Sequence, residues 1–177
     1  PIHASGEVAQ IVGPGMPADI RVIEHRACEE GSCVEIGRTP RGTPVRLNRV
    51  AAESDGLVLV GVASHHYFAG FGGGPKALFP GAASRTAIRA NHSLVMYAGD
   101  KDPRACKGKL DGNPVHEDLC DAVAMRDPAF LVNSVNDGEG RPLAFFAGHW
   151  RSAHRQACEF LDRAALLTGP CGPFDLL

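Results

Sequence analysis

Residues 57–76 read LVLVGVASHHYFAGFGGGPK and join an apolar run to a loop that is dense in glycine. The run Leu57–Ala63 has no charged or strongly polar side chain, which is typical of a strand buried on both faces of a sheet covered by helices. Sheets of this kind bind ligands where a strand passes into a loop at its carboxyl end. The stretch therefore predicts a parallel sheet with a candidate site directly after one strand.

Helical and extended patterns alternate along the rest of the chain. The spacing of apolar, glycine and proline residues predicts helices at 1–11, 49–54, 84–97, 113–126 and 150–167, and extended segments at 20–25, 34–37, 44–48, 57–63, 129–135, 142–147 and 174–177. This alternation indicates the α/β class, with a mostly parallel sheet flanked by helices in a Rossmann-like three-layer arrangement. We expect one α/β domain over residues 1–177.

The composition limits the classes of partner. The 177 residues are 44% hydrophobic and 21% charged, which is ordinary for a soluble globular protein. A net charge of −2 gives no electrostatic reason to expect nucleic acid or an anionic membrane as a partner. No apolar run approaches the ~20 residues that cross a bilayer, and no signal peptide is visible at Pro1. We therefore predict a cytoplasmic protein.

Six cysteines are present, and we interpret them as mostly free thiols in a reducing compartment. The spacing of His25, Cys28 and Cys33 offers three ligands for a structural zinc ion. It lacks the usual C-x2-C knuckle and an obvious fourth ligand, so it supports zinc only weakly.

The glycine-rich loop can be read in two ways. Glycines at 70 and 72–74 allow positive φ angles and let backbone N–H groups approach a flat ring or a phosphate, but they equally suit a tight turn. The run matches neither G-x-x-x-x-G-K-[ST] nor G-x-G-x-x-G. Lys76 at its end is either a phosphate ligand or nucleophile, or an ordinary surface lysine.

Three histidines accompany the loop. His66 follows a strand, where an imidazole can act as a general acid or base, or simply make one hydrogen bond. Neighbouring side chains at a strand end point in opposite directions, so only one of His65 and His66 should enter a pocket. His92 falls in the next helix as a possible metal ligand or an ordinary polar residue. Together these residues indicate a functional site without naming a reaction.

The order of these motifs resembles the nickel-dependent lactate racemase family of 2-hydroxyacid racemases and epimerases. The pattern H-[HY]-x-A-G-F-x-G-G-x-K fits residues 66–76 and is followed by P-G-x-A-S at 80–84 and by N-H at Asn91-His92. Further similarity lies in G-T-P-V-x-x-N-R at 42–49, G-N-P-V-x-E-D at 112–118 and the A-G…A-H element at 147–154.

The resemblance implies a nickel-pincer nucleotide, pyridinium-3-thioamide-5-thiocarboxylic acid mononucleotide nickel. Lys76 would tether this cofactor covalently through a thioamide bond. His92 would supply the protein ligand to nickel, for which a neutral imidazole in a roughly square-planar site is suitable. Phe68 would pack against the cofactor ring, and Gly73 and Gly74 would let the backbone approach it.

The resemblance also implies racemisation or epimerisation of a lactate-like 2-hydroxyacid by hydride transfer to and from the tethered cofactor. His66 would be a catalytic acid/base that takes the hydroxyl proton. The family's second catalytic histidine, in a T-G-x-H-R motif, is not in this sequence. We therefore expect the central part of an N-terminal catalytic domain, inactive alone, whose partners are the 2-hydroxyacid and cofactor-maturation proteins.

Two alternatives remain open at this point. The chain is alternatively a non-catalytic α/β domain that binds a phosphorylated small molecule or a metal. A zinc hydrolase that uses His65, His66 and His92 is less well supported, because no H-E-x-x-H or similar motif is present. Departures from the family pattern at Glu24-His25-Arg26, Pro75 and His149 leave the hydroxyacid undetermined.

Overall fold

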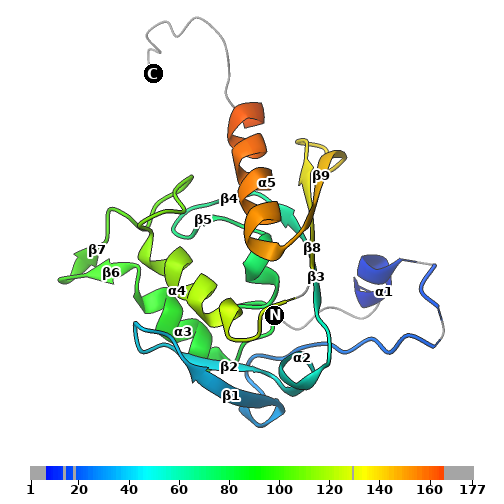
Figure 1. Ribbon diagram of the computed structural model, residues 1–177, viewed down its shortest axis with the longest axis horizontal. Coiled ribbons are helices and arrows are strands. Elements are labelled where there is room, and N and C mark those ends of the chain that lie inside the picture. The colour runs from blue at the N-terminus through cyan, green and yellow to red at the C-terminus, as the bar shows by residue number, and fades with distance from the viewer. Residues whose placement is uncertain (1–6, 14, 18, 129, 166–177) are drawn as a thin grey trace, which may run out of the picture.

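The structure, a computed structural model, describes residues 7–13, 15–17, 19–128 and 130–165 (Figure 1). In chain order its elements are α1 (Glu7–Val12), η1 (Glu30–Ser32), β1 (Cys33–Arg38), β2 (Pro44–Asn48), α2 (Arg49–Glu53), β3 (Val58–Ala63), β4 (His65–His66), β5 (Gly70–Phe71), η2 (Gly74–Ala77), α3 (Arg85–Ser93), β6 (Met96–Tyr97), β7 (Asp100–Lys101), α4 (Pro114–Ala124), β8 (Phe130–Asn136), β9 (Pro142–Gly148) and α5 (Trp150–Ala165). The predicted α/β class is confirmed.

The principal sheet is mixed and has the strand order β3-β8-β9. β3 and β8 are parallel, in register from Val58 opposite Phe130 to Ala63 opposite Val135. Parallel neighbours need a long crossover, and here it carries the glycine-rich loop, α3 and α4. β9 follows β8 through a short turn and therefore pairs with it antiparallel.

Helix α5 packs along one face of this sheet, while the described part of the chain leaves the other face open (Figure 1). Ala63, Val135 and Ala157 are buried between the sheet and the helix. On the opposite face Val60 is 71% exposed and Phe145 is 68% exposed. The prediction that residues 57–63 are buried on both faces is therefore wrong, because an apolar run does not reveal whether a second layer covers it.

The largest core cluster lies away from the sheet's open face. It joins β2, α3, α4 and the start of α5, with Leu47, Leu119 and Trp150 almost fully buried. Leu78 and Phe79, directly after η2, belong to the same cluster and are at most 1% exposed. The glycine-rich loop is therefore held to the core immediately after Lys76.

Several predicted boundaries change. Residues 20–25 form no strand, since they find no pairing partner among the described residues. The helix expected over 84–97 ends at Ser93, where the chain turns into the β6–β7 hairpin. The predicted helix 1–11 falls partly outside the described residues, and the predicted strand 174–177 lies wholly outside them.

The described cysteines are free thiols, as predicted, and Cys171 lies outside the described residues. Both ring nitrogens of His25 are engaged, with the Ala83 carbonyl at 2.9 Å and the Asn48 side chain at 3.3 Å. No three potential ligands among the described residues are grouped to hold a metal ion. His25 therefore serves the packing of this loop.

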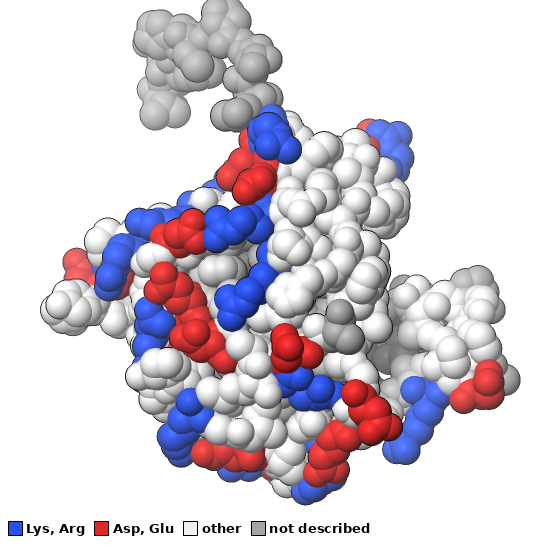
Figure 2. Space-filling model, viewed as in Figure 1, with Lys and Arg blue, Asp and Glu red and all other residues white. Residues whose placement is uncertain are grey.

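Charged side chains of both signs are interspersed over the surface in Figure 2, whereas the region over β8 and β9 carries few of them. No helix within the described ranges has the length and apolar character that a membrane span requires.

A buried polar network ties α3 to α4 and to the β1–β2 turn. Asp118 is fully buried and accepts hydrogen bonds from the Thr39 hydroxyl and from the Asn91 amide, the latter at 2.9 Å. The Asn91 amide also donates to the Val115 carbonyl at 3.1 Å. Since Asn91 precedes His92, this network fixes the position of His92 relative to α4.

We predict that Asp118→Ala lowers the free energy of unfolding by about 3 kcal/mol, because two buried donors lose their charged acceptor. Asp121→Ala on the same helix is the control. It removes an ion pair to Arg41 from a side chain that is 38% exposed, and should cost less than about 1 kcal/mol. Chemical denaturation measures both, and equal losses would contradict the role of the network.

Candidate functional site

Three of the predicted site residues meet around the ring of Phe68. The ring centroid of Phe68 lies 4.5 Å from that of His66 and 5.0 Å from that of His92. The ammonium nitrogen of Lys76 lies 5.8 Å from the same centroid. Phe68 itself is 7% exposed, whereas the other three are partly open to solvent. The structure therefore brings together the predicted residues from β4, η2 and α3.

His65 points away from this cluster. It lies on β4, and its Nε2 is 2.8 Å from the Asp162 carboxylate on α5. The alternation of side chains along a strand accounts for the divergence of the two histidines. The prediction that the two side chains diverge is confirmed, and a zinc site shared by His65, His66 and His92 is wrong, since no three potential ligands among the described residues are grouped to hold a metal ion.

The tautomer of His66 follows from its contacts. Its Nδ1 accepts a hydrogen bond from the backbone N–H of Ala69 at 3.2 Å. Burial, with the nearby Lys76 and His92, lowers the pKa of His66 to about 4. The ring is therefore neutral at pH 7 and carries its proton on Nε2, where it acts as a hydrogen-bond donor.

Lys76 occupies an environment that favours its neutral amine. Burial lowers the pKa of its side chain below the usual lysine value. The η2 turn that carries it is closed by backbone bonds from Lys76 N–H to the Gly73 carbonyl and from Leu78 N–H to the Pro75 carbonyl, each 3.1 Å long. A partly desolvated lysine on a fixed turn is a competent nucleophile toward a carbonyl or thioacid carbon.

His92 is oriented as a metal ligand would be. Its Nδ1 donates to the Ile88 carbonyl at 2.8 Å, which leaves the lone pair on Nε2 free. Burial lowers its pKa, the hydrogen bond to Ile88 opposes this shift, and Lys76 adds to it. No group of three potential protein ligands that could hold a metal ion exists among the described residues.

Gly73 and Gly74 adopt φ angles of +71° and +56°, which disfavour other residues. A Cβ at Gly73 would collide with the Val62 carbonyl, and a Cβ at Gly74 would collide with the His154 ring. The close contact with β3 at Gly73 and the close contact with α5 at Gly74 are therefore sufficient to require glycine at both positions. A cofactor contact through their backbone stays a prediction.

Two positioning residues escaped the sequence analysis. The Gly74 N–H donates to Oδ1 of Asn133 at 3.1 Å, so the Asn133 amide nitrogen faces Nδ1 of His154 at 3.2 Å and donates to it. Asn133 and His154 are 0% and 3% exposed. The signal for Asn133 was a polar residue inside the apolar strand FLVNSVN, while His154 was noted only within a family element.

The fold and this cluster define a class of protein: an α/β domain whose histidine–lysine–histidine site follows a strand of a mixed sheet. Residues 3–102 match the family described as "Lactate racemase N-terminal domain". The chain is 35% identical over 155 residues to lactate racemase of Lactiplantibacillus plantarum, covering 88% of this chain and 36% of that protein. It is 40% identical over 130 residues to lactate racemase of Thermoanaerobacterium thermosaccharolyticum, covering 73% and 30%.

Solved structures agree. The lactate racemase apoprotein from Thermoanaerobacterium thermosaccharolyticum superposes with a TM-score of 0.82 at 34% identity, over 89% of this chain and 37% of that one. A Thermotoga maritima protein, at 22% identity and a TM-score of 0.75 over 91% and 44% of the two chains, shares the fold. The chain belongs to the lactate racemase family, and it spans about a third of the length of the curated relatives it matches.

We predict that Gly74→Ala disrupts the Lys76 turn. The new methyl group would have to displace the buried His154 ring, and the residue would be strained at φ +56°. A loss of stability of about 2 kcal/mol or more is expected on chemical denaturation. Gly138→Ala is the control, since its Cβ meets nothing within 4 Å. An unaffected Gly74→Ala protein would show that the turn can move freely.

The buried His154 also predicts a pH dependence of stability. Burial, together with His116 and nearby cations, lowers its folded-state pKa to about 3 from the ordinary 6.5. The unfolded chain therefore binds a proton as the pH falls below about 6.5 while the folded one does not, so stability is lost toward acid. Each such histidine contributes a slope of at most about 1.4 kcal/mol per pH unit.

Denaturation of the wild type and of His154→Asn at pH 7 and pH 5 measures this slope. The variant should start less stable and lose less stability over the interval. The exposed His149, changed to Asn, should retain the wild-type slope. A wild-type slope in His154→Asn would refute the assignment.

Proposed function

We propose that the protein racemises or epimerises a lactate-like 2-hydroxyacid, using a nickel-pincer nucleotide tethered at Lys76. The observation that carries this proposal is the convergence of His66, Lys76 and His92 on one buried aromatic ring, Phe68. The names of the curated relatives support lactate as the substrate. We further propose a cytoplasmic protein whose partners include cofactor-maturation proteins.

The residues present fit such a group. Lys76 offers an amine of lowered pKa for a thioamide bond, and His92 offers a free Nε2 lone pair on a neutral ring. The Phe68 ring gives both side chains a common apolar wall, against which a flat aromatic group can pack. When bound, the group supplies a hydride acceptor and a Lewis-acidic nickel ion.

His66 handles the proton of the substrate hydroxyl. Oxidation at C2 would require the hydroxyl proton to leave the oxygen as the keto group forms, and the reverse reaction would require its return, so a side chain that accepts and returns this proton is needed. In the observed tautomer Nε2–H can donate to the keto oxygen. To accept the hydroxyl proton on Nε2, the ring must carry its proton on Nδ1 and give up its contact with the Ala69 N–H.

The first test is covalent loading. The full-length protein is co-expressed with cofactor-maturation enzymes, and intact mass, peptide mapping and nickel content are measured. We expect an adduct at Lys76 and bound nickel, both lost in Lys76→Ala and retained in the control Lys101→Ala, an exposed lysine of the β6–β7 hairpin. An unmodified Lys76 with no nickel above background would remove the basis for this function.

The second test separates binding from proton transfer. His66→Asn should keep the Lys76 adduct and the nickel but lose at least about 100-fold in the rate of D-lactate and L-lactate interconversion, followed by chiral chromatography. His92→Ala should keep the adduct and lose nickel. A loaded protein that turns over no 2-hydroxyacid would favour the alternative of a non-catalytic binding domain.

A further inference from the structure

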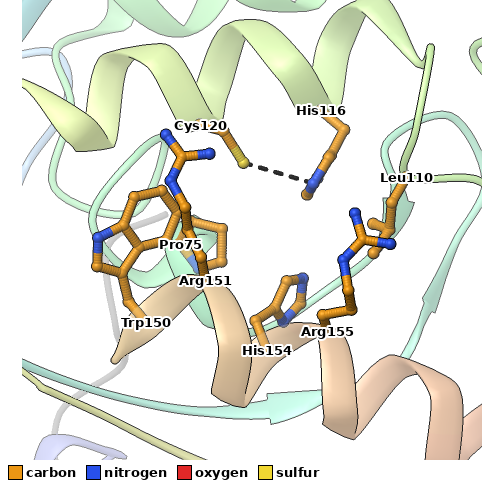
Figure 3. A pocket seen from close by; sticks show the side chains of 8 residues that line it. All are labelled: Pro75, Leu110, His116, Cys120, Trp150, Arg151, His154 and Arg155. Carbon is orange, nitrogen blue, oxygen red and sulfur yellow. Dashed lines mark hydrogen bonds between the residues drawn. The ribbon is translucent and has the colours of Figure 1, made fainter. Parts of the chain in front are cut away.

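A second candidate site lies in a cleft between α4 and α5, on the far side of the Lys76 turn (Figure 3). Its volume is about 130 Å³. Pro75 forms one wall, so the cleft lies directly behind the residue that bears the proposed tether. The remaining polar and aromatic lining comes from one face of each helix: His116, Trp150, Arg151, His154 and Arg155.

The buried His154 presents an N–H donor to this cleft. Because Nδ1 accepts from the Asn133 amide, the neutral ring carries its proton on Nε2. The contact of Nε2 among the described residues is the Cys158 sulfur at 3.6 Å, a weak acceptor. Figure 3 shows one ring nitrogen of His154 directed into the space between His116 and Arg155. A buried donor without an oxygen acceptor favours an anion there.

His116 faces the same space from α4, and its ring centroid lies 6.1 Å from that of His154. Its Nε2 lies 3.4 Å from the Cys120 sulfur (Figure 3). Burial lowers the pKa of His116 to about 4 and raises that of the Cys120 thiol to about 12. The pair is thus a neutral imidazole and a neutral thiol, which excludes a thiolate nucleophile at this position.

Among the described residues, one arginine at the mouth of the cleft forms no ion pair. Asp111 pairs with Arg155, while Glu117 and Asp121 share Arg41. The guanidinium of Arg151 instead stacks over the Trp150 ring at 4.4 Å and forms no ion pair within the described residues. Stacking on tryptophan holds the guanidinium flat while its N–H groups stay available.

We propose that the α4–α5 cleft binds a phosphate group, held by Arg151 at the mouth and by the Nε2–H of His154 within. A planar guanidinium fork and a fixed imidazole N–H are both matched to phosphate oxygens. The cleft is smaller than the roughly 300–1,000 Å³ of pockets that enclose whole organic ligands. It therefore takes free phosphate, or the phosphate of a larger molecule whose remainder projects into solvent. This site is separate from the Phe68 cluster and does not depend on the proposed reaction.

The test is calorimetric titration of the full-length protein with inorganic phosphate at constant ionic strength and pH 7. We expect a dissociation constant on the order of 1 mM or tighter, and at least about tenfold weaker binding in Arg151→Gln. Arg163→Gln, an exposed arginine near the end of the same helix, is the matched control and should bind as the wild type does. Glycerol phosphate replaces inorganic phosphate in a second arm.

The two arms identify the source of the phosphate group. Tighter binding of the monoester supports a larger ligand, and tighter binding of the inorganic ion supports free phosphate. The ¹⁵N resonance of His154 Nε2 should shift on titration, which places the ligand in the cleft. No binding up to about 10 mM, equal binding by Arg151→Gln, an equal loss in Arg163→Gln, or an unmoved His154 signal would each overturn the proposal.

Discussion

The arrangement depends on one hydrogen bond, from the Gly74 N–H to the side-chain oxygen of Asn133. It joins the glycine-rich loop to the central strand β8, and its geometry sets the amide orientation of Asn133 and thereby the tautomer of His154. Both sides are buried, so the bond forms where water does not compete. With Leu78 and Phe79 anchored in the core beyond it, the Lys76 turn is fixed at both ends.

Phe68 lies among three ionisable side chains whose pKa values are all lowered. Its ring lies within 6 Å of the His66 and His92 rings and of the Lys76 ammonium nitrogen. Burial then lowers the pKa of each, and the positive charge of Lys76 lowers those of both histidines further. A cluster that disfavours three positive charges presents neutral imidazoles and a more nucleophilic amine, the forms that metal ligation and covalent attachment require.

Local patterns predicted what depends on neighbours in the sequence. Glycines, a following helix cap at Ser84 and the alternation of His65 and His66 were sufficient to place the loop after a strand and to separate the two histidines. The roles proposed for Lys76 and His92 come from the family resemblance. Their spacing alone is equally consistent with an ordinary surface lysine and an ordinary polar histidine. The features that the sequence did not predict depend on tertiary contacts. The open face of β3 and the absence of a strand at 20–25 follow from which partners those segments meet.

The α4–α5 cleft illustrates the same limit on a smaller scale. His116 with Cys120, and His154 with Cys158, are two histidine–cysteine pairs spaced four apart, so each pair lies on one helical face. The sequence places the members of each pair together, but only the packing of α4 against α5 places the two pairs face to face. The Pro75–Lys76 turn lies between the Phe68 cluster and this cleft. Neither side favours a further positive charge: the Phe68 side already holds Lys76, and the cleft side holds the buried N–H of His154 and Arg151, which forms no ion pair among the described residues.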